Sequence, residues 1–208
     1  MNIMQNRAEA NSHKNRSLNW FQDIYCKLDP NEIAARCNLE FDGQSFSIRI
    51  MNKNYRAAFP EFSLKSADPN DAEIRNGYEK ILFIRFLCEG RFTPALGRQL
   101  SYHEIPWGET YYSNFDGRCI KRLAARFGSS VDVFRGIMEE KLNAEKLNKS
   151  DAGYRFEFCS GLYMSFLLWA ADDEFPASAQ ILFDDNFPRA FTAEDIAVAG
   201  EVALGHLM

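Results

Sequence analysis

The strongest constraint on the fold comes from two neighbouring segments whose apolar residues follow the period of a β-strand. In residues 154–158, aromatic residues alternate with Arg155 and Glu157, which is typical of a strand with one wet face. Residues 162–169 are apolar apart from Ser165, which indicates a central strand covered on both faces. The C-terminal half of the chain is therefore expected to contribute neighbouring strands to a sheet.

Other segments with a strand period lie before and after this pair. Phe46, Ile48 and Ile50 alternate with polar residues, and a turn at residues 52–54 follows them, so residues 41–59 predict a hairpin. Residues 179–183 predict one more short strand. The sheet is therefore expected to draw strands from both ends of the chain.

Apolar residues at helical spacing predict the remaining elements. The expected helices are 18–28, a short one after Asp29, 78–87, 115–127, 130–142, and a terminal helix that Thr192 opens with Asp195 close to a capping-box position. Polar residues 143–153 separate the helical middle from the later strands. Strands, then helices, then strands before a last helix predict the α+β class: a largely antiparallel sheet with helices packed on one face.

Length and apolar content suit a chain that folds around one core. The 208 residues are 46% hydrophobic and include 18 Phe. A chain of this size buries roughly 70% of the surface that it exposes when unfolded, so neither disulfides nor a metal is needed to hold the fold. We expect one α+β domain over residues 18–208, preceded by a flexible polar tail over residues 1–17.

Charge and cysteine usage restrict the setting. The chain has 24 Lys and Arg against 29 Asp and Glu, a net charge of -5, which argues against nucleic acid as the main partner. Its longest apolar stretch, residues 162–171, is about half the length of a membrane-spanning helix. The 5 cysteines form neither a disulfide framework nor a CxxC metal motif. These observations predict a cytoplasmic protein without a membrane or nucleic-acid partner.

A loop rich in Gly, Pro and aromatic residues is predicted between residues 90 and 112. Its rings can form a platform for a flat ligand, and a histidine near a carboxylate can move protons near neutral pH. Two interpretations stay open: the rings line a pocket, or they plug the edge of the sheet while Glu104 bonds loop amides. The candidate ligand-binding residues are Arg98, Tyr102, His103, Glu104, Trp107, Tyr111 and Tyr112.

Two acidic clusters flank the predicted strand at 179–183. Asp172, Asp173 and Glu174 precede it, and Asp184 and Asp185 follow it directly. If the clusters converge, their oxygens can hold a hard divalent ion such as Mg²⁺ or Ca²⁺. Carboxylates at strand ends also accept hydrogen bonds from backbone N–H groups in turns, which requires no ion. The sequence leaves both interpretations open.

The chain resembles the domain-of-unknown-function family three-seven-eight-six in the strings FLCEGRFTPALGRQLSYHEIPWGETYYSNFDGRCIKRLAARFG, LLWAADDEFPASAQILFDD and FTAEDIAVAG. Tyr102 replaces the family's usual Phe, and His103 lies at a variable position. The resemblance implies a shared fold and an anaerobic bacterial or archaeal cytoplasm, but it transfers no reaction. The residues that carry it include Gly97, Ser101, Glu104, Pro106 and Gly108, then Trp169, Asp172, Glu174, Phe175 and Pro176, then Leu182, Phe183 and Asp184, and finally Thr192, Glu194 and Asp195.

Two functional hypotheses follow. The favoured one is a binding domain of anaerobe metabolism whose loop, residues 98–112, accepts a small molecule or a protein partner. The alternative is an enzyme that uses the clustered carboxylates, with or without a divalent metal, and His103 or Glu104 as the acid–base group. The sequence contains none of the common dinucleotide, P-loop, serine-hydrolase or zinc-protease motifs, so it assigns neither a reaction nor a cofactor.

Overall fold

The strands of the protein form one antiparallel sheet. The computed structural model describes residues 18–69, 74 and 77–207, and the tail predicted over residues 1–17 lies outside them. The strand order is β4-β3-β2-β7-β8-β9-β5, with β1 paired to β2 and β6 paired to β7. The strands are β1 (Glu40–Phe41), β2 (Ser45–Ile50), β3 (Lys53–Ala58), β4 (Leu64–Ser66), β5 (Gln99–Ser101), β6 (Glu145–Leu147), β7 (Ala152–Cys159), β8 (Leu162–Trp169) and β9 (Ser178–Asp184).

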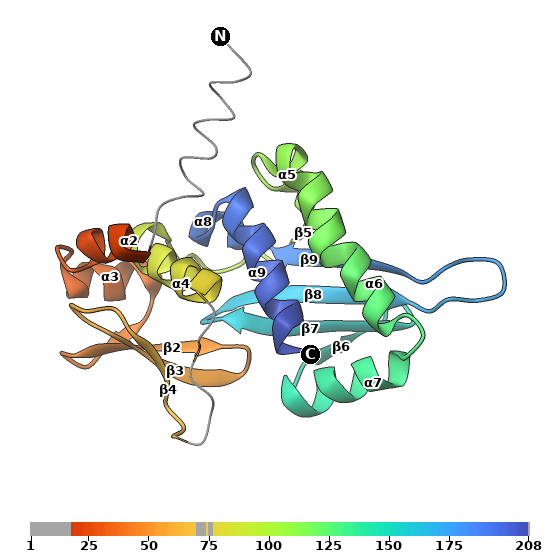
Figure 1. Ribbon diagram of the computed structural model, residues 1–208, viewed down its shortest axis with the longest axis horizontal. Helices are drawn as coiled ribbons and strands as arrows, with labels where there is room; N and C mark the ends of the chain where they lie inside the picture. Colours follow the sequence, from red (N-terminus) through yellow and green to blue (C-terminus); the bar gives the residue numbers. More distant parts are fainter. Residues whose placement is uncertain (1–17, 70–73, 75–76, 208) are drawn as a thin grey trace, which may run out of the picture.

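A short pairing joins the N-terminal and C-terminal parts of this sheet. Strand β2 meets β7 through the register pair Ile50 and Cys159, and the N–H of Met51 donates to the carbonyl of Phe158 at 3.0 Å beside it. Strands β7, β8 and β9, in contrast, pair along most of their length. This long ladder is the surface on which the central helices pack (Figure 1).

The helices lie on one side of the β7–β9 ladder (Figure 1). On β7, Tyr154, Phe156 and Phe158 are buried on the helical side, whereas Arg155 and Glu157 are half-buried on the other face. The predicted α+β class is confirmed. No helix in the described ranges is long and apolar enough to cross a membrane. The helical elements are α2 (Leu18–Tyr25), α3 (Pro30–Cys37), α4 (Gly77–Glu89), η1 (Tyr102–Glu104), α5 (Gly108–Phe115), η2 (Asp116–Ile120), α6 (Lys121–Phe127), α7 (Val131–Gly136), η3 (Ile137–Lys141), α8 (Phe187–Ala190) and α9 (Ala193–His206).

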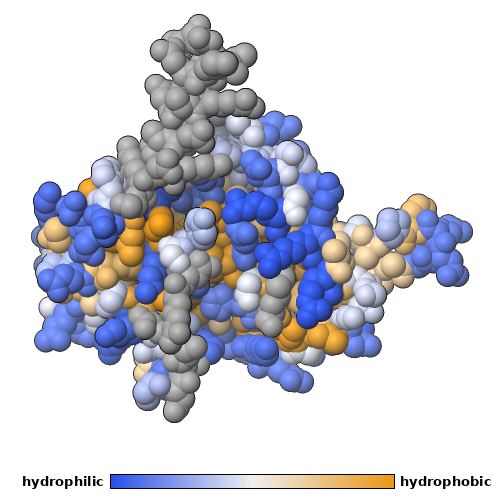
Figure 2. Space-filling model, viewed as in Figure 1, coloured by the Kyte–Doolittle hydropathy of each residue, from blue (hydrophilic) through white to orange (hydrophobic). Residues whose placement is uncertain are grey.

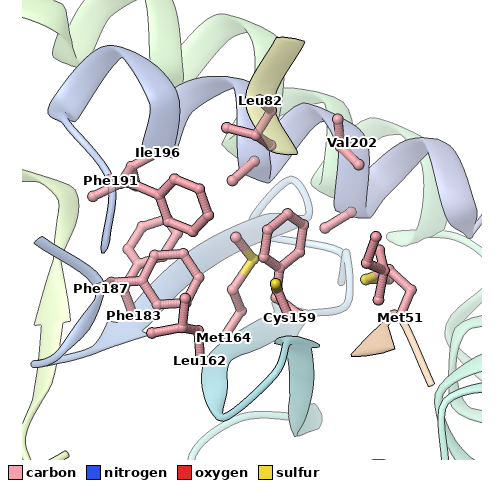
Figure 3. Packing of buried hydrophobic residues seen from close by; sticks show 14 of the residues in the cluster. Met51, Leu82, Cys159, Leu162, Met164, Phe183, Phe187, Phe191, Ile196 and Val202 are labelled. Carbon is pink, nitrogen blue, oxygen red and sulfur yellow. The ribbon is translucent and has the colours of Figure 1, made fainter. Parts of the chain in front are cut away.

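Phenylalanine rings fill the space between α9 and the sheet (Figure 3). The ring of Phe158 on β7 lies 6.0 Å from Phe187 and 6.2 Å from Phe191, and Phe183 on β9 lies 5.2 Å from Phe187. From above, α9 contributes Ile196 and other apolar side chains to the same core cluster. The segment that leads into α9 is therefore anchored to the sheet by several rings in tilted and edge-to-face contact.

Strand β8 is covered on its second face by side chains rather than by helices. Its hydroxyl-bearing residue, Ser165, is buried and accepts a 2.6 Å hydrogen bond from Gln99 Nε2. The guanidinium of Arg155 lies 3.9 Å from the centre of the Tyr163 ring. These contacts explain why β8 lacks the alternation of a strand with one wet face.

The largest difference from the sequence-based elements lies in residues 90–112, where a loop was expected. Strand β5 and the short helix η1 occupy part of it, and α5 begins at Gly108. The helix predicted over residues 115–127 is the later part of a longer run that includes the π-helical segment η2. Tyr111 and Tyr112, near the start of α5, are only half-buried. The sequence of this part therefore has no apolar stripe from which a helix could be predicted.

Smaller differences concern ends and turns. Strand β6 lies within the polar stretch 143–153, where no strand was expected, and the first helix ends at Tyr25 rather than Leu28. The hairpin turn consists of Met51 and Asn52, whose φ angles are 46° and 63°. A two-residue hairpin turn of this hand requires positive φ at both positions, which moves the turn ahead of the predicted one.

Candidate functional site

A cavity of about 270 Å³ opens beside the loop that was predicted to bind a ligand. It lies where the turn before α5 meets the C-terminal half of α4, α8 and the start of α9. Its apolar wall contains Ile105, Pro106, Trp107, Phe191 and Ala193. We call this cavity the Trp107 pocket.

The backbone of a tight turn holds Trp107 at the pocket. The N–H of Gly108 donates to the carbonyl of Ile105 at 2.8 Å, and Ile105 is itself buried. Within this turn Trp107 takes a left-handed conformation, with φ +68°, and the residue is 80% exposed. For a bulky residue this conformation costs on the order of 1–3 kcal/mol. The packing of an indole that is so exposed does not offset that cost.

Gly108 fixes the direction of the same turn. A Cβ atom at this position would lie 1.9 Å from the carbonyl oxygen of Tyr102. Only glycine permits this approach, and it lets α5 begin directly after Trp107. The indole is therefore held outward by backbone packing on both sides of it.

The buried charges of the Trp107 pocket form an ion pair between α4 and α9. Arg85 Nη1 lies 2.9 Å from Asp195 Oδ1, and the two side chains are 13% and 9% exposed. The second oxygen, Asp195 Oδ2, accepts hydrogen bonds from Thr192 Oγ1 at 2.7 Å and from the Thr192 N–H at 3.3 Å. This closes the capping box predicted for the last helix.

The Arg85 guanidinium keeps a donor that the protein does not use. It lies 5.5 Å from the centre of the Phe21 ring, and its Nε is buried without a hydrogen-bond partner among the described residues. Both oxygens of Asp195, in contrast, accept hydrogen bonds. Because Nε has almost no exposed surface, it does not face the open space of the pocket, and the Arg85–Asp195 pair leaves no carboxylate oxygen of Asp195 without a partner.

Tyr102, predicted to bind a ligand, is part of the core instead. It is 1% exposed, its ring stacks on Phe115 with centroids 4.1 Å apart, and its hydroxyl donates to the carbonyl of Ala193 at 2.6 Å. Burial raises the pKa of Tyr102 well above its usual range. Tyr102 therefore fills the interior, as the second interpretation of the loop expects. Of the seven candidate loop residues, Trp107 is the one that lines the pocket.

His103, Tyr111 and Tyr112 do not line the Trp107 pocket, and only Tyr112 stacks on His103. His103 Nδ1 lies 2.5 Å from Glu109 Oε2, and its ring stacks on Tyr112 with centroids 3.6 Å apart. Tyr111 is half-buried against the core, and this burial raises its pKa. The structure therefore pairs His103 with Glu109, a residue that the sequence analysis did not consider.

Glu104 and Arg98 stabilise the backbone of the loop. Glu104 Oε2 accepts hydrogen bonds from the Ser101 N–H at 2.8 Å and from Ser101 Oγ at 2.9 Å. The bond from the Ser101 N–H is the main cause that lowers the pKa of Glu104. Arg98 Nη2 lies 3.9 Å from the other carboxylate oxygen, and both side chains are exposed. Neither residue lines the Trp107 pocket.

The first acidic cluster lies at the tip of the β8–β9 connection, which projects from the body with a hydrophilic end (Figure 2). Asp172 Oδ1 accepts the N–H groups of Glu174 at 2.9 Å and Phe175 at 2.6 Å. Asp173 is exposed on the same tip. Asp172 therefore forms a turn of the kind that needs no ion.

Asp184 lies at the opposite end of β9. The strand has 7 residues, so it is about 20 Å long at a rise of about 3.3 Å per residue. The first cluster lies in the connection before the strand begins. Asp184 is buried and accepts from Arg155 Nη2 at 2.6 Å. In the part of the chain that the structure describes, no group of three or more His, Cys, Asp and Glu could hold a metal ion. The acidic clusters do not converge.

A larger cavity, of about 490 Å³, lies between α4, α6 and the C-terminal half of α9. Its charged groups pair with one another: His206 Nε2 lies 2.9 Å from Glu79 Oε1, and Arg118 bonds Glu201. Its volume exceeds that of the Trp107 pocket, but none of the residues that line it has a left-handed backbone conformation like that of Trp107. We therefore take the Trp107 pocket as the candidate site.

Sequence reasoning missed Arg85 as a site residue. The available signal was a charged residue within residues 81–87, the part of the helix predicted over residues 78–87 that is otherwise apolar. Asp195 was predicted only as a cap. Its second role, as the partner of Arg85, arises because α4 packs against α9.

Comparisons with known proteins complete the description of this site. No curated protein and no solved structure matches the chain. One family model matches residues 29–205, which include every residue named above as lining the Trp107 pocket. The chain therefore belongs to the family described as Domain of unknown function (DUF3786).

Proposed function

We propose that the protein is a small-molecule-binding domain and that its ligand occupies the Trp107 pocket. The observation that carries the proposal is the conformation of Trp107: a left-handed backbone that holds an 80% exposed indole at the edge of a cavity. Strained backbones of this kind gather at functional sites, where the surrounding structure over-determines them.

A ligand that stacks on the indole of Trp107 would bury apolar surface that the free protein leaves exposed. Stacking on an aromatic face contributes roughly 0.5–1.5 kcal/mol beyond the burial of area. The Arg85–Asp195 ion pair and the partly apolar wall supply the mixture of polar and apolar lining typical of small-molecule sites. At about 270 Å³, the pocket suits a small metabolite better than a segment of a protein partner.

The alternative, a carboxylate-based enzyme, depended on convergence of the acidic residues. Because Asp172 and Asp184 lie at opposite ends of β9, that arrangement is not formed. Of the two hypotheses, the binding domain therefore has the better geometric support.

A reducing, anaerobic cytoplasm is part of the same proposal. It is supported by the resemblance and by the cysteines, since all five, Cys26, Cys37, Cys88, Cys119 and Cys159, are free thiols. Burial raises the pKa of Cys37 to about 11 and that of Cys119 to about 12, as expected for inert core residues.

Thermal melts of the full chain against a metabolite panel test the binding proposal. A true ligand at about 100 times its Kd should raise Tm by roughly 5–10 °C. The same ligand should stabilise Trp107→Ala much less. Leu96→Ala is the matched control, because Leu96 is also a large apolar residue, 89% exposed, but does not line the pocket. A ligand that stabilises wild type and Trp107→Ala equally would contradict the proposal.

A further inference from the structure

We infer that the ligand of the Trp107 pocket is a small flat ring compound that carries no net charge. This inference rests on the proposed binding function and adds the chemical class of the ligand. Three features of the lining carry it: an ion pair that is closed within the protein, exposed charges of opposite sign, and an apolar wall whose hydrogen-bonding groups are largely used.

The buried ion pair of the pocket is satisfied by the protein itself. Asp195 Oδ1 faces Arg85 Nη1 at 2.9 Å, and Asp195 Oδ2 accepts from the hydroxyl and the N–H of Thr192. The Nε of Arg85 has almost no exposed surface, so it does not reach a ligand. Each charge of the pair has its counter-charge beside it, and the pair leaves no uncompensated charge for a ligand to neutralise.

The other two charged residues of the lining, Glu89 and Arg189, are exposed and opposite in sign. Interactions between charges in water are weak and are screened by salt. Arg189 favours an anion and Glu89 favours a cation. Together they therefore select neither sign of charge on a ligand.

The apolar wall has few hydrogen-bonding groups left for a ligand. The carbonyl of Ile105 is used by the turn before α5, and that of Ala193 accepts from the Tyr102 hydroxyl at 2.6 Å. The two prolines of the lining, Pro106 and Pro188, have no N–H. The wall therefore offers a ligand mainly apolar contact.

This lining imposes different costs on charged and neutral ligands. A charged group that enters the pocket loses hydration, and the buried charges there are already paired with each other. A neutral ring loses little hydration and gains contact with the indole of Trp107, which is 80% exposed in the free protein. The cavity, at about 270 Å³, lies just below the usual range for drug-sized ligands of about 300–1,000 Å³, so it suits one ring system.

Titration of the wild-type chain, followed by NMR, tests the class with three probes of nearly the same planar shape. At neutral pH benzamide is uncharged, benzoate is an anion and benzamidine is a cation. Benzamide should bind about tenfold or more tightly than either ion, because it alone avoids the loss of hydration of a charge. Cyclohexanecarboxamide, which is neutral but not flat, should bind more weakly than benzamide.

Variants place the binding in the pocket and test its cause. Trp107→Ala should weaken the binding of benzamide by about tenfold, and the matched control Leu96→Ala should not change it. Asp195→Asn removes the counter-charge of Arg85 and keeps an oxygen that can accept from Thr192. It should raise the affinity for benzoate relative to benzamide by about tenfold. Circular dichroism identifies an unfolded Asp195→Asn, in which case the comparison of the three probes in wild type decides.

The outcomes separate the two claims. If benzoate or benzamidine binds as tightly as benzamide and Trp107→Ala weakens them all, the neutral class is wrong and the binding function stands. An unchanged ratio of benzoate to benzamide affinity in a folded Asp195→Asn also overturns the neutral class, as does a failure of all the probes to bind. The binding function falls on its own test, when no panel compound depends on Trp107.

Discussion

Tyr102 and Trp107 belong to the same short stretch of chain, yet the fold treats them in opposite ways. Tyr102 is 1% exposed, stacked on Phe115 and bonded to the carbonyl of Ala193. Trp107 is 80% exposed in a left-handed backbone conformation. Both are large aromatic residues with one hydrogen-bonding group. Only one of them has its polar group and its ring satisfied inside the protein.

The difference shows how a packed residue can expose its neighbour. Because Tyr102 is fixed by α9 and its carbonyl lies against Gly108, the intervening turn has little freedom. That rigidity forces strain onto Trp107. In this comparison Tyr102 has the structural role, and Trp107 has the surface that a ligand can use.

The largest effect is expected for Tyr102→Ala, which should reduce the free energy of unfolding by about 3–5 kcal/mol, because it removes a buried aromatic ring. Tyr102→Phe should cost about 1 kcal/mol, the contribution of one hydrogen bond. Urea denaturation at constant m-value measures both. Nearly equal costs for the two variants would mean that the ring does not pack as described.

Gly108→Ala should have the next largest effect and reduce the free energy of unfolding by about 3 kcal/mol through overpacking. The reason is that the new Cβ would lie 1.9 Å from the carbonyl oxygen of Tyr102. Gly136→Ala is the matched control, since nothing lies within 4 Å of its Cβ position in α7. That control should gain about 0.5–1 kcal/mol in a helix. If Gly108→Ala is as stable as wild type, the turn is not rigid.

The two acidic positions extend the same contrast between satisfied and exposed groups. Asp184→Asn should reduce the free energy of unfolding by about 2 kcal/mol, because it removes a charge-assisted hydrogen bond to the partly buried Arg155. Asp172→Asn should change stability by less than about 0.5 kcal/mol, since an amide oxygen can still accept the turn N–H groups. Chemical denaturation of the two variants compares them. Equal losses would contradict their different environments.

The pH dependence of Glu104 is a smaller effect on the same loop. Its pKa is lowered in the folded state, mainly by the Ser101 N–H. The stability that ionised Glu104 contributes is therefore present above its unfolded pKa and is lost as the pH falls through the folded value. The difference in stability between wild type and Glu104→Gln should shrink from about pH 6 to about pH 3. A difference that grows on acidification would reverse the sign of this linkage.

Trp107→Gly should also have only a small effect on the free energy of unfolding, which should stay within about 1 kcal/mol of wild type. Glycine relieves the left-handed strain, and little packing is lost from a residue that is 80% exposed. Ligand binding in the Trp107 pocket should nevertheless be lost. A loss of stability above about 2 kcal/mol, comparable to that of a core residue, would assign Trp107 a packing role.

Much of the fold could be predicted because its signals are local. The bounds of β8, the cap of α3 by Asp29 and the capping box of α9 follow from patterns over a few residues. The start of α5 could not be predicted in this way. Its first residue, Gly108, is required by the close approach of Tyr102. A contact of this kind leaves no periodic pattern in the sequence.

By itself, the sequence determined the α+β class, the central strands and the position of the aromatic-rich segment that contains Trp107. The tertiary structure alone decided which ring of that loop is exposed, that Arg85 on α4 meets Asp195 on α9, and that the acidic clusters stay apart. The physical reason is the separation along the chain of the residues that interact. Hydrophobic period and capping depend on neighbours along the chain, whereas a pocket, an ion pair and a spare donor depend on which distant elements pack together.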